Sequence, residues 1–160
     1  MGFEFGFARR PYKESDNGYN DANILFFWCG RENSALCRFL GFLSDYDWVN
    51  DEIKIEVKKL HFLEPVMEKL EKNKDYNIIK KLFYFGDTFV TEYWNEMTFE
   101  QKTKLRLDFL PLTNDSNINY ICVELYERFE EGYFLLDALY EAYQKMLKEK
   151  LEYVWLYRSY

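Results

Sequence analysis

The chain has 160 residues and a net charge of −7, and 48% of its residues are hydrophobic and 21% aromatic. This length suits a single domain, and this hydrophobic content excludes general disorder. The negative charge opposes direct binding to nucleic acid or to an anionic membrane, because both attract Lys and Arg. A basic protein partner fits better, and plain solubility is the alternative explanation of the charge.

The cysteines exclude two further classes of protein. Cys29, Cys37 and Cys122 are odd in number and form no CxxC pair, so neither a disulfide framework nor a zinc ribbon is indicated. The opening residues lack the basic region and long apolar run of a signal peptide. The longest apolar stretch, from Ile24 to Cys29, is too short to span a bilayer. We therefore expect a cytoplasmic protein.

The chain opens with a period-two pattern. Phe3, Phe5 and Phe7 alternate with smaller or polar residues, which predicts a strand with one buried face. Gly6 lies inside this strand and is best explained by the close approach of another backbone. A polar, turn-rich loop is expected over 11–23.

A longer apolar segment follows, and its spacing is helical. The pattern predicts a helix from Ile24 to Leu43. Gly30 can interrupt the front of this helix, in which case Asn33 or Ser34 caps a shorter one. An acidic loop is expected over 45–52.

The middle of the chain begins with a second alternating run. Ile53, Ile55 and Val57 predict a strand. Apolar residues at helical spacing come next, and we expect their helix to begin near Glu64 with Pro65 in its first turn.

Two shorter helices and a loop are predicted beyond it. Asp75 suits the cap of a helix that Gly86 ends. Thr98 and Gln101 have the spacing of a capping box. A polar loop is predicted over 114–119.

The chain closes with a long helix and a strand. One apolar face continues from Leu136 to Leu151, and Tyr153, Trp155 and Tyr157 then alternate with other residues. We expect this strand to pair with the first, so that the phenylalanines at 3, 5 and 7 meet Trp155 and Tyr157. The predicted fold is α+β: a helix-rich single domain over 1–160 with a small sheet that pairs the N- and C-terminal strands.

Three segments together carry a resemblance to other proteins. The chain opens Met1-Gly2-Phe3-Glu4-Phe5, an aromatic segment runs from Phe27-Trp28 to Arg38-Phe39, and the chain ends Tyr157-Arg158-Ser159-Tyr160. It thereby resembles a family of small uncharacterised phage and prophage proteins, which open Met-Gly-Leu-Asp-Met-Tyr-Leu and close on a Tyr-x-Ser-Ser-Trp-like strand. The opening motif differs here at several positions, and 75–119 is additional. The resemblance implies a mobile genetic element as the setting. It implies nothing about activity, because the family is uncharacterised.

Catalytic and metal-binding patterns are weak. His61 is the only histidine, so any Ser-His-Asp or Cys-His pair would have to use it. It adjoins apolar residues and has no evident nucleophile, which favours a structural or surface histidine. Asp45, Asp47 and Asp51 lack the spacing of a calcium loop. With no phosphate-binding or hydrolase motif either, we expect no catalysis, metal or cofactor.

The segment from Glu124 to Glu141 is the strongest candidate for a binding surface. It holds six carboxylates and one arginine, interleaved with aromatic residues. Carboxylates steer a basic partner and aromatic side chains anchor it, whereas the alternative is an ordinary acidic helix start over a core stripe. The predicted partner-binding residues are Glu124, Glu127, Glu130, Glu131, Tyr133, Asp137 and Glu141.

Two classes of function remain open. The first is a non-catalytic inhibitor that blocks a basic nucleic-acid-handling protein, either as a phage anti-defence (anti-CRISPR-like) protein or as a toxin immunity protein. The second is a small-ligand (nucleotide) binding protein or enzyme with a pocket lined by Tyr and carboxylates. A flat, acidic, aromatic face would favour the first class, and a deep cavity with converging polar groups the second.

Overall fold

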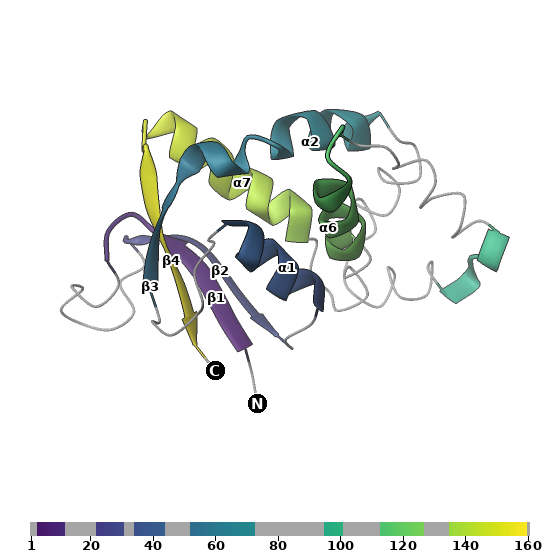
Figure 1. The fold of residues 1–160 in the computed structure, drawn as a ribbon, viewed down its shortest axis with the longest axis horizontal. Helices are drawn as coiled ribbons and strands as arrows, with labels where there is room; N and C mark the ends of the chain where they lie inside the picture. Colours follow the sequence, from purple (N-terminus) through teal and green to yellow (C-terminus); the bar gives the residue numbers. More distant parts are fainter. Residues whose placement is uncertain are drawn as a thin grey trace. The chain divides into compact units, whose positions relative to one another are not determined.

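Helices and one small antiparallel sheet make up the described part of the chain, which confirms the α+β class. The computed structural model describes residues 3–11, 22–30, 34–43, 52–72, 95–100, 113–126 and 135–159. Its elements are β1 (Phe3–Ala8), β2 (Ile24–Gly30), α1 (Ser34–Leu43), β3 (Glu52–Glu56), the 3-10 helix η2 (Val57–Leu60), α2 (Leu63–Glu71), α6 (Ser116–Tyr126), α7 (Leu135–Lys148) and β4 (Tyr153–Ser159) (Figure 1). None of the helices within these ranges has the length and apolar character that crossing a membrane requires.

The chain divides into two compact units. The sheet unit contains Met1–His61 and Glu141–Tyr160, and the helical unit contains Phe62–Tyr140. All four strands, α1, η2 and the end of α7 belong to the sheet unit, whereas α2, α6 and the start of α7 belong to the helical unit. This division does not test whether 1–160 fold as one domain, which stays a prediction.

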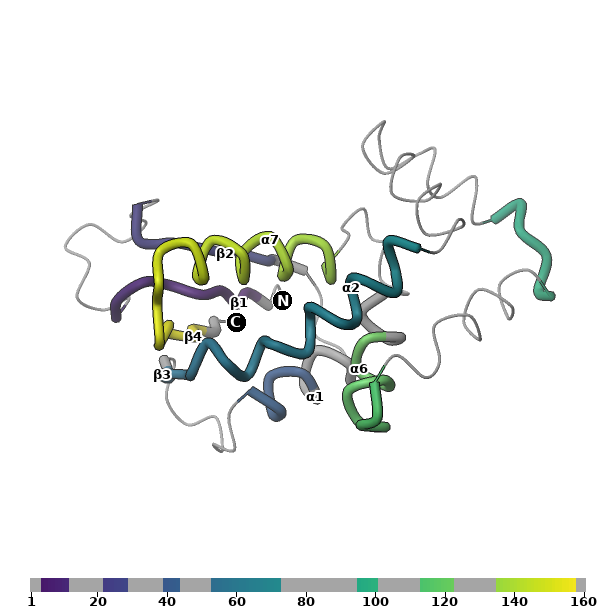
Figure 2. Tube along the Cα trace, turned by 90° about the horizontal axis from the view of Figure 1, so that it is seen from above, coloured from purple at the N-terminus to yellow at the C-terminus, as the bar shows by residue number. Residues whose placement is uncertain are grey.

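The sheet places the first and last strands at its centre. The strand order is β2-β1-β4-β3, and every neighbouring pair is antiparallel. Seen from above, β1 and β4 run side by side between the other two strands (Figure 2). The predicted pairing of the two terminal strands is therefore confirmed.

The register between these strands differs from the prediction by one residue. Gly6 lies opposite Tyr157, and Ala8 lies opposite Trp155. Phe5 and Phe7 therefore point to the other face of the sheet, and their expected meeting with Trp155 and Tyr157 was wrong. Both faces of β4 are apolar, so the alternation identified a strand without showing which face turns to the core.

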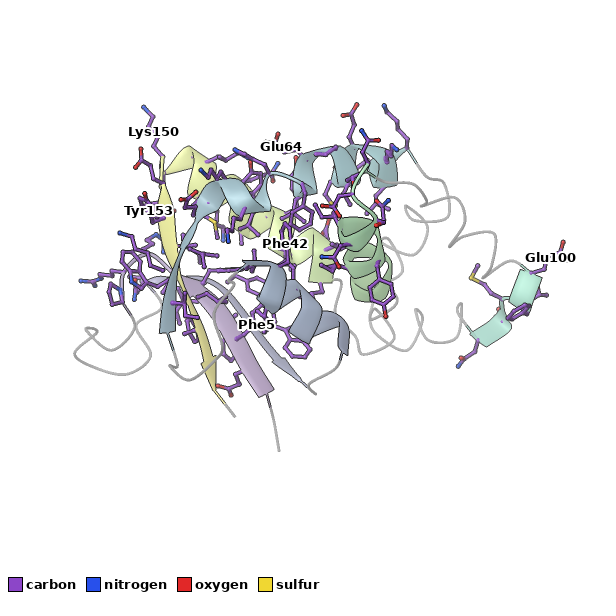
Figure 3. All side chains as sticks on the ribbon, viewed as in Figure 1. Phe5, Phe42, Glu64, Glu100, Lys150 and Tyr153 are labelled. Atoms are coloured by element: carbon purple, nitrogen blue, oxygen red, sulfur yellow. The ribbon has the colours of Figure 1, made fainter. Side chains whose placement is uncertain are left out.

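The core face of the sheet is built around Phe5. This residue is fully buried, and its ring centroid lies 5.7 Å from that of Trp28 on β2 and 6.5 Å from that of Phe39 on α1. Phe5 points from β1 toward α1, so α1 covers this face (Figure 3). Burying a side chain of this size stabilises the fold by roughly 1.5–3 kcal/mol.

The segment from Ile24 to Gly30 corrects the prediction of a long helix. It forms β2 and pairs with β1, with Trp28 opposite Phe5. A short apolar run of this kind fits a buried strand as well as a helix, and here pairing with β1 decides the outcome. The alternative of a shorter helix beyond Gly30 was right, because α1 begins at Ser34.

The start of α6 corrects the predicted loop over 114–119. The helix begins at Ser116, and the Asp115 carboxylate accepts hydrogen bonds from the backbone N–H groups of Asn117 (2.9 Å) and Ile118 (3.2 Å). Asp115 thus acts as the N-cap, satisfying donors that the first turn leaves without partners. Short polar residues favour both turns and caps, so their composition alone did not separate the two.

The helix predicted near Glu64 is confirmed. α2 begins at Leu63 with Pro65 in its first turn, and the 3-10 turn of η2 precedes it. Its apolar stripe, Leu63, Met67 and Leu70, is buried. Glu52, the last residue of the loop predicted over 45–52, instead opens β3. The rest of that loop, the helix predicted from Asp75, the end of the one predicted from Thr98 and most of the loop over 11–23 lie outside the described residues.

A long-range ion pair joins β1 to the end of α7. The Arg9 guanidinium donates to both carboxylate oxygens of Glu149, at 2.5 and 2.8 Å, and to the Ala22 carbonyl at 2.8 Å. The hydrogen bond from Arg9 holds the pKa of Glu149 below its ordinary value. Partly exposed ion pairs contribute little to stability, so the main effect of the Arg9–Glu149 pair is to fix the position of the end of α7.

The turn after α7 is a Schellman motif. The N–H of Leu151 bonds the Met146 carbonyl and the N–H of Lys150 bonds the Leu147 carbonyl, both at 3.0 Å. Lys150 has a φ of 57°, the left-handed conformation that this position requires and that glycine adopts most easily. The turn thereby directs the chain into β4.

Gly6→Ala should lower the free energy of unfolding by about 1–3 kcal/mol, because its new methyl group would overlap the Phe26 carbonyl oxygen and the Tyr157 ring. Urea denaturation measures the change. Gly41→Ala is the matched control: a Cβ there meets no atom within 4 Å, and on α1 it should stabilise by up to about 1 kcal/mol. Equal stability of Gly6→Ala and the parent would contradict the close contact.

Lys150→Gly should raise the free energy of unfolding by about 1 kcal/mol, because it removes the cost of a left-handed L-residue. The same change at Lys145, inside α7, should lower it by a similar amount. Thermal denaturation of both variants checks the pair. A loss of stability in Lys150→Gly would show that this side chain contributes more than its backbone conformation costs.

Candidate functional site

The structure describes part of the predicted acidic segment. Glu141 on α7 is exposed, as a partner-binding residue must be, but Asp137 on the same helix is only 8% exposed. Asp137 is therefore mostly covered by other residues, and its role at a binding surface stays a prediction. The backbone of Glu124 lies in α6. Its side chain and the whole of Glu127, Glu130, Glu131 and Tyr133 lie outside the described residues.

An open cavity in the sheet unit is the clearest candidate site. Its volume is about 370 Å³, within the range of small-ligand pockets. It lies where β3 ends and β4 begins, beside η2 and the end of α7. The residues that line it are Glu56, Val57, Lys58, His61, Leu147, Leu151, Glu152 and Tyr153.

Strand pairing and the turn after α7 bring this lining together. Glu56 lies opposite Tyr153 in the β3–β4 register, and the N–H of Val57 donates to the Glu152 carbonyl at 2.9 Å. Beyond this bond the two segments diverge. The segment after β3 continues into η2, and the segment before β4 leads back through the Schellman turn to α7. Lys150 and Tyr153 mark this end of the unit in Figure 3. The cavity occupies the space that the divergence leaves.

The cavity combines an aliphatic base with a charged rim. Val57 is buried, Leu151 is half-buried and Leu147 is exposed. On the rim, the Lys58 ammonium lies 2.8 Å from the Glu56 carboxylate, and this bond raises the pKa of Lys58. These two charges offset one another.

The imidazole of His61 is held by a core tyrosine. His61 is exposed, but its Nδ1 is hydrogen-bonded to the hydroxyl of Tyr143, which is fully buried on α7. The two rings meet edge to face, with centroids 5.7 Å apart and planes at 83°. The other ring nitrogen, Nε2, remains for solvent or a ligand. The interpretation of His61 as a structural or surface residue agrees with this placement, and its lack of a catalytic role stays a prediction.

Sequence reasoning missed most of this cavity. It recognised His61 only because it is the one histidine, and it assigned Tyr143 to an apolar helix stripe. Glu56 lies near the end of one predicted strand and Glu152 just before another, so their positions could have indicated carboxylates at strand ends. Joining them required the β3–β4 register and the turn after α7.

Other chemistry finds no support in the described ranges. No group of three His, Cys, Asp or Glu side chains there is arranged to hold a metal ion. Cys122 on α6 is fully buried, and burial raises the pKa of its thiol to about 12. Such a thiol is a poor nucleophile, because the reactive form is the thiolate.

Comparison with known proteins gives no match. No protein-family model matches the sequence, and neither curated proteins nor solved structures yield a match to the chain. Functional inference therefore depends on the residues and geometry described above.

Cys122 should resist alkylation in the native protein, because its thiol is buried and remains protonated at neutral pH. Iodoacetamide treatment at pH 8 followed by peptide mass spectrometry measures labelling at each cysteine separately. The Cys122 peptide should become labelled only after unfolding in urea. Rapid labelling in the folded state would show that the thiol is accessible.

Proposed function

We propose that the protein is a cytoplasmic, non-catalytic inhibitor from a mobile genetic element, which binds and blocks a basic protein that handles nucleic acid. A phage anti-defence (anti-CRISPR-like) protein and a toxin immunity protein both fit this description. The observation that carries the proposal is the acidic, aromatic composition of the segment from Glu124 to Glu141.

The distribution of charge supports this choice. Acidic and basic residues are nearly equal in number over the ranges that the structure describes, so most of the net charge of −7 comes from other segments. The stretch 127–134 is one of them, with three carboxylates and one arginine. Clustered charge of one sign steers an oppositely charged partner more effectively than the same charge spread evenly.

Exposed Glu141 extends the acidic segment into the described part of α7. Tyr140 beside it is half-buried and presents part of its ring. Carboxylates at the rim of an interface set the association rate, whereas desolvated aromatic side chains supply most of the affinity. The proposed surface contains both kinds of residue.

A small-ligand or nucleotide binding protein, or an enzyme with such a pocket, is the second candidate. The observation that favours it is the cavity, whose rim holds Tyr153 and the carboxylates of Glu56 and Glu152. Two carboxylates oppose the phosphate groups of a nucleotide, so the first proposal is preferred.

Changing Glu127, Glu130 and Glu131 together to Lys should slow association with the partner and weaken its dependence on salt. The partner is first captured from host lysate on the parent protein and identified by mass spectrometry, and association rates are then measured over a range of ionic strength. Each single change should cost only about 0–1 kcal/mol of binding. Tyr133→Ala should cost about 2 kcal/mol if this ring is an anchor.

A second triple variant separates steering from total charge. Glu68, Glu96 and Glu100 are exposed, and changing them to Lys gives the same net charge. This control should associate faster than the first variant. Melting temperatures of both must stay near the parent's, because carboxylates also stabilise a helix start. Equal association of the first variant and the parent would refute the proposal.

A further inference from the structure

One carboxylate of the cavity has no counter-charge. Glu56 already pairs with Lys58 at 2.8 Å, whereas the exposed Glu152 side chain makes no ion pair or hydrogen bond with any described residue. Glu152 uses only its backbone carbonyl, which accepts from Val57. The cavity thus presents a net negative charge beside an aliphatic base.

His61 supplies a second polar atom with a fixed position. Its Nδ1 is engaged by the buried Tyr143 hydroxyl, so the ring cannot turn freely and Nε2 is the atom left for a ligand. When Nδ1 donates to the Tyr143 oxygen, Nε2 carries a lone pair and accepts a hydrogen bond. A ligand that donates several hydrogen bonds from one charged atom matches this acceptor and the Glu152 carboxylate together.

The ring of Tyr153, which lines the cavity, already carries the ammonium group of Lys54, which lies outside the lining. The Nζ atom of Lys54 lies 4.3 Å from the centroid of the Tyr153 ring and 5.7 Å from that of Trp155. Aromatic faces attract cations through their quadrupole. The surroundings of Tyr153 therefore suit positive charge and disfavour anions at this end of β4.

We propose that this cavity binds an aliphatic ammonium group, that of a lysine side chain on the basic partner. Its N–H groups donate to Glu152 and to His61 Nε2, and its methylene chain lies on Val57, Leu147 and Leu151. Long cationic side chains commonly bury their stems on apolar surface while the head stays at a polar rim. The assignment of the lysine to a partner rests on the proposed function.

The test uses the whole chain and a lysine whose backbone charges are removed, Nα-acetyl-lysine methylamide. His61 is the only histidine, so its imidazole NMR signals report on the cavity without ambiguity. Titration should shift these signals saturably, with a Kd in the range of about 1–10 mM for so small a probe. Nα-acetyl-norleucine methylamide, which has the same aliphatic stem without the ammonium, should bind at least tenfold more weakly.

Two variants locate the binding group. Glu152→Gln should weaken lysine methylamide binding at least fivefold. Glu100→Gln removes an exposed carboxylate that lies outside both the cavity lining and the acidic segment, and it should leave binding unchanged. Equal binding by the Glu152 variant and the parent, or equal binding of the norleucine and lysine probes, would overturn the proposal.

Two further probes distinguish a lysine side chain from an anion and from a free amine. Inorganic phosphate should shift the His61 signals less than lysine methylamide does at equal concentration and ionic strength, and stronger phosphate binding would overturn the cation assignment. Tenfold tighter binding of 1,5-diaminopentane would assign the site to a free amine and overturn its link to a partner. Loss of lysine binding leaves the acidic-segment proposal standing, because the Glu127, Glu130 and Glu131 variant tests that proposal separately.

Discussion

The sheet unit depends on the contact between Gly6 and Tyr157. These residues face one another across the two central strands, and the Tyr157 ring occupies the space that a Cβ at position 6 would need. Because β2 pairs with β1 and β3 with β4 in the described sheet, both outer strands rely on this central pairing. The cavity depends on this pairing too. β4 pairs with β1 on one side and with β3 on the other, and the β3–β4 register places Glu56 opposite Tyr153.

Much of this architecture was predictable, because single-period patterns are strong signals. Alternation identified β1, β3 and β4, and helical spacing identified α2 and α7. The failures occurred where one sequence suits two structures. Ile24–Gly30 is apolar at every spacing, so its pairing partner decides that it is a strand. Asp115 and its polar neighbours suit a turn as well as a cap, and the helix that follows decides between them. β4 is apolar on both faces, so its orientation depends on the glycine opposite it.

The candidate site was less predictable than the fold. The acidic segment is a local compositional feature, and a sequence shows such features directly. The cavity joins His61 to Glu152 through a strand register, a left-handed turn at Lys150 and a hydrogen bond to a core tyrosine. Tyr143 fits the apolar periodicity of α7 so well that nothing marked its hydroxyl as functional. Burial also separates Asp137 from Glu141, although both are carboxylates on one helix.

The order of strands also constrains how the protein is made. β1 leaves the ribosome well before β4, yet they are adjacent in the sheet. At about 5–20 residues per second, β1 waits on the order of 10 s for its central partner. During that time β2 can cover one edge of β1, but the other edge, beside Gly6, stays open to pairing with another chain. A nascent chain therefore carries one open edge of β1 until β4 has been made, and conditions that slow translation should favour its aggregation.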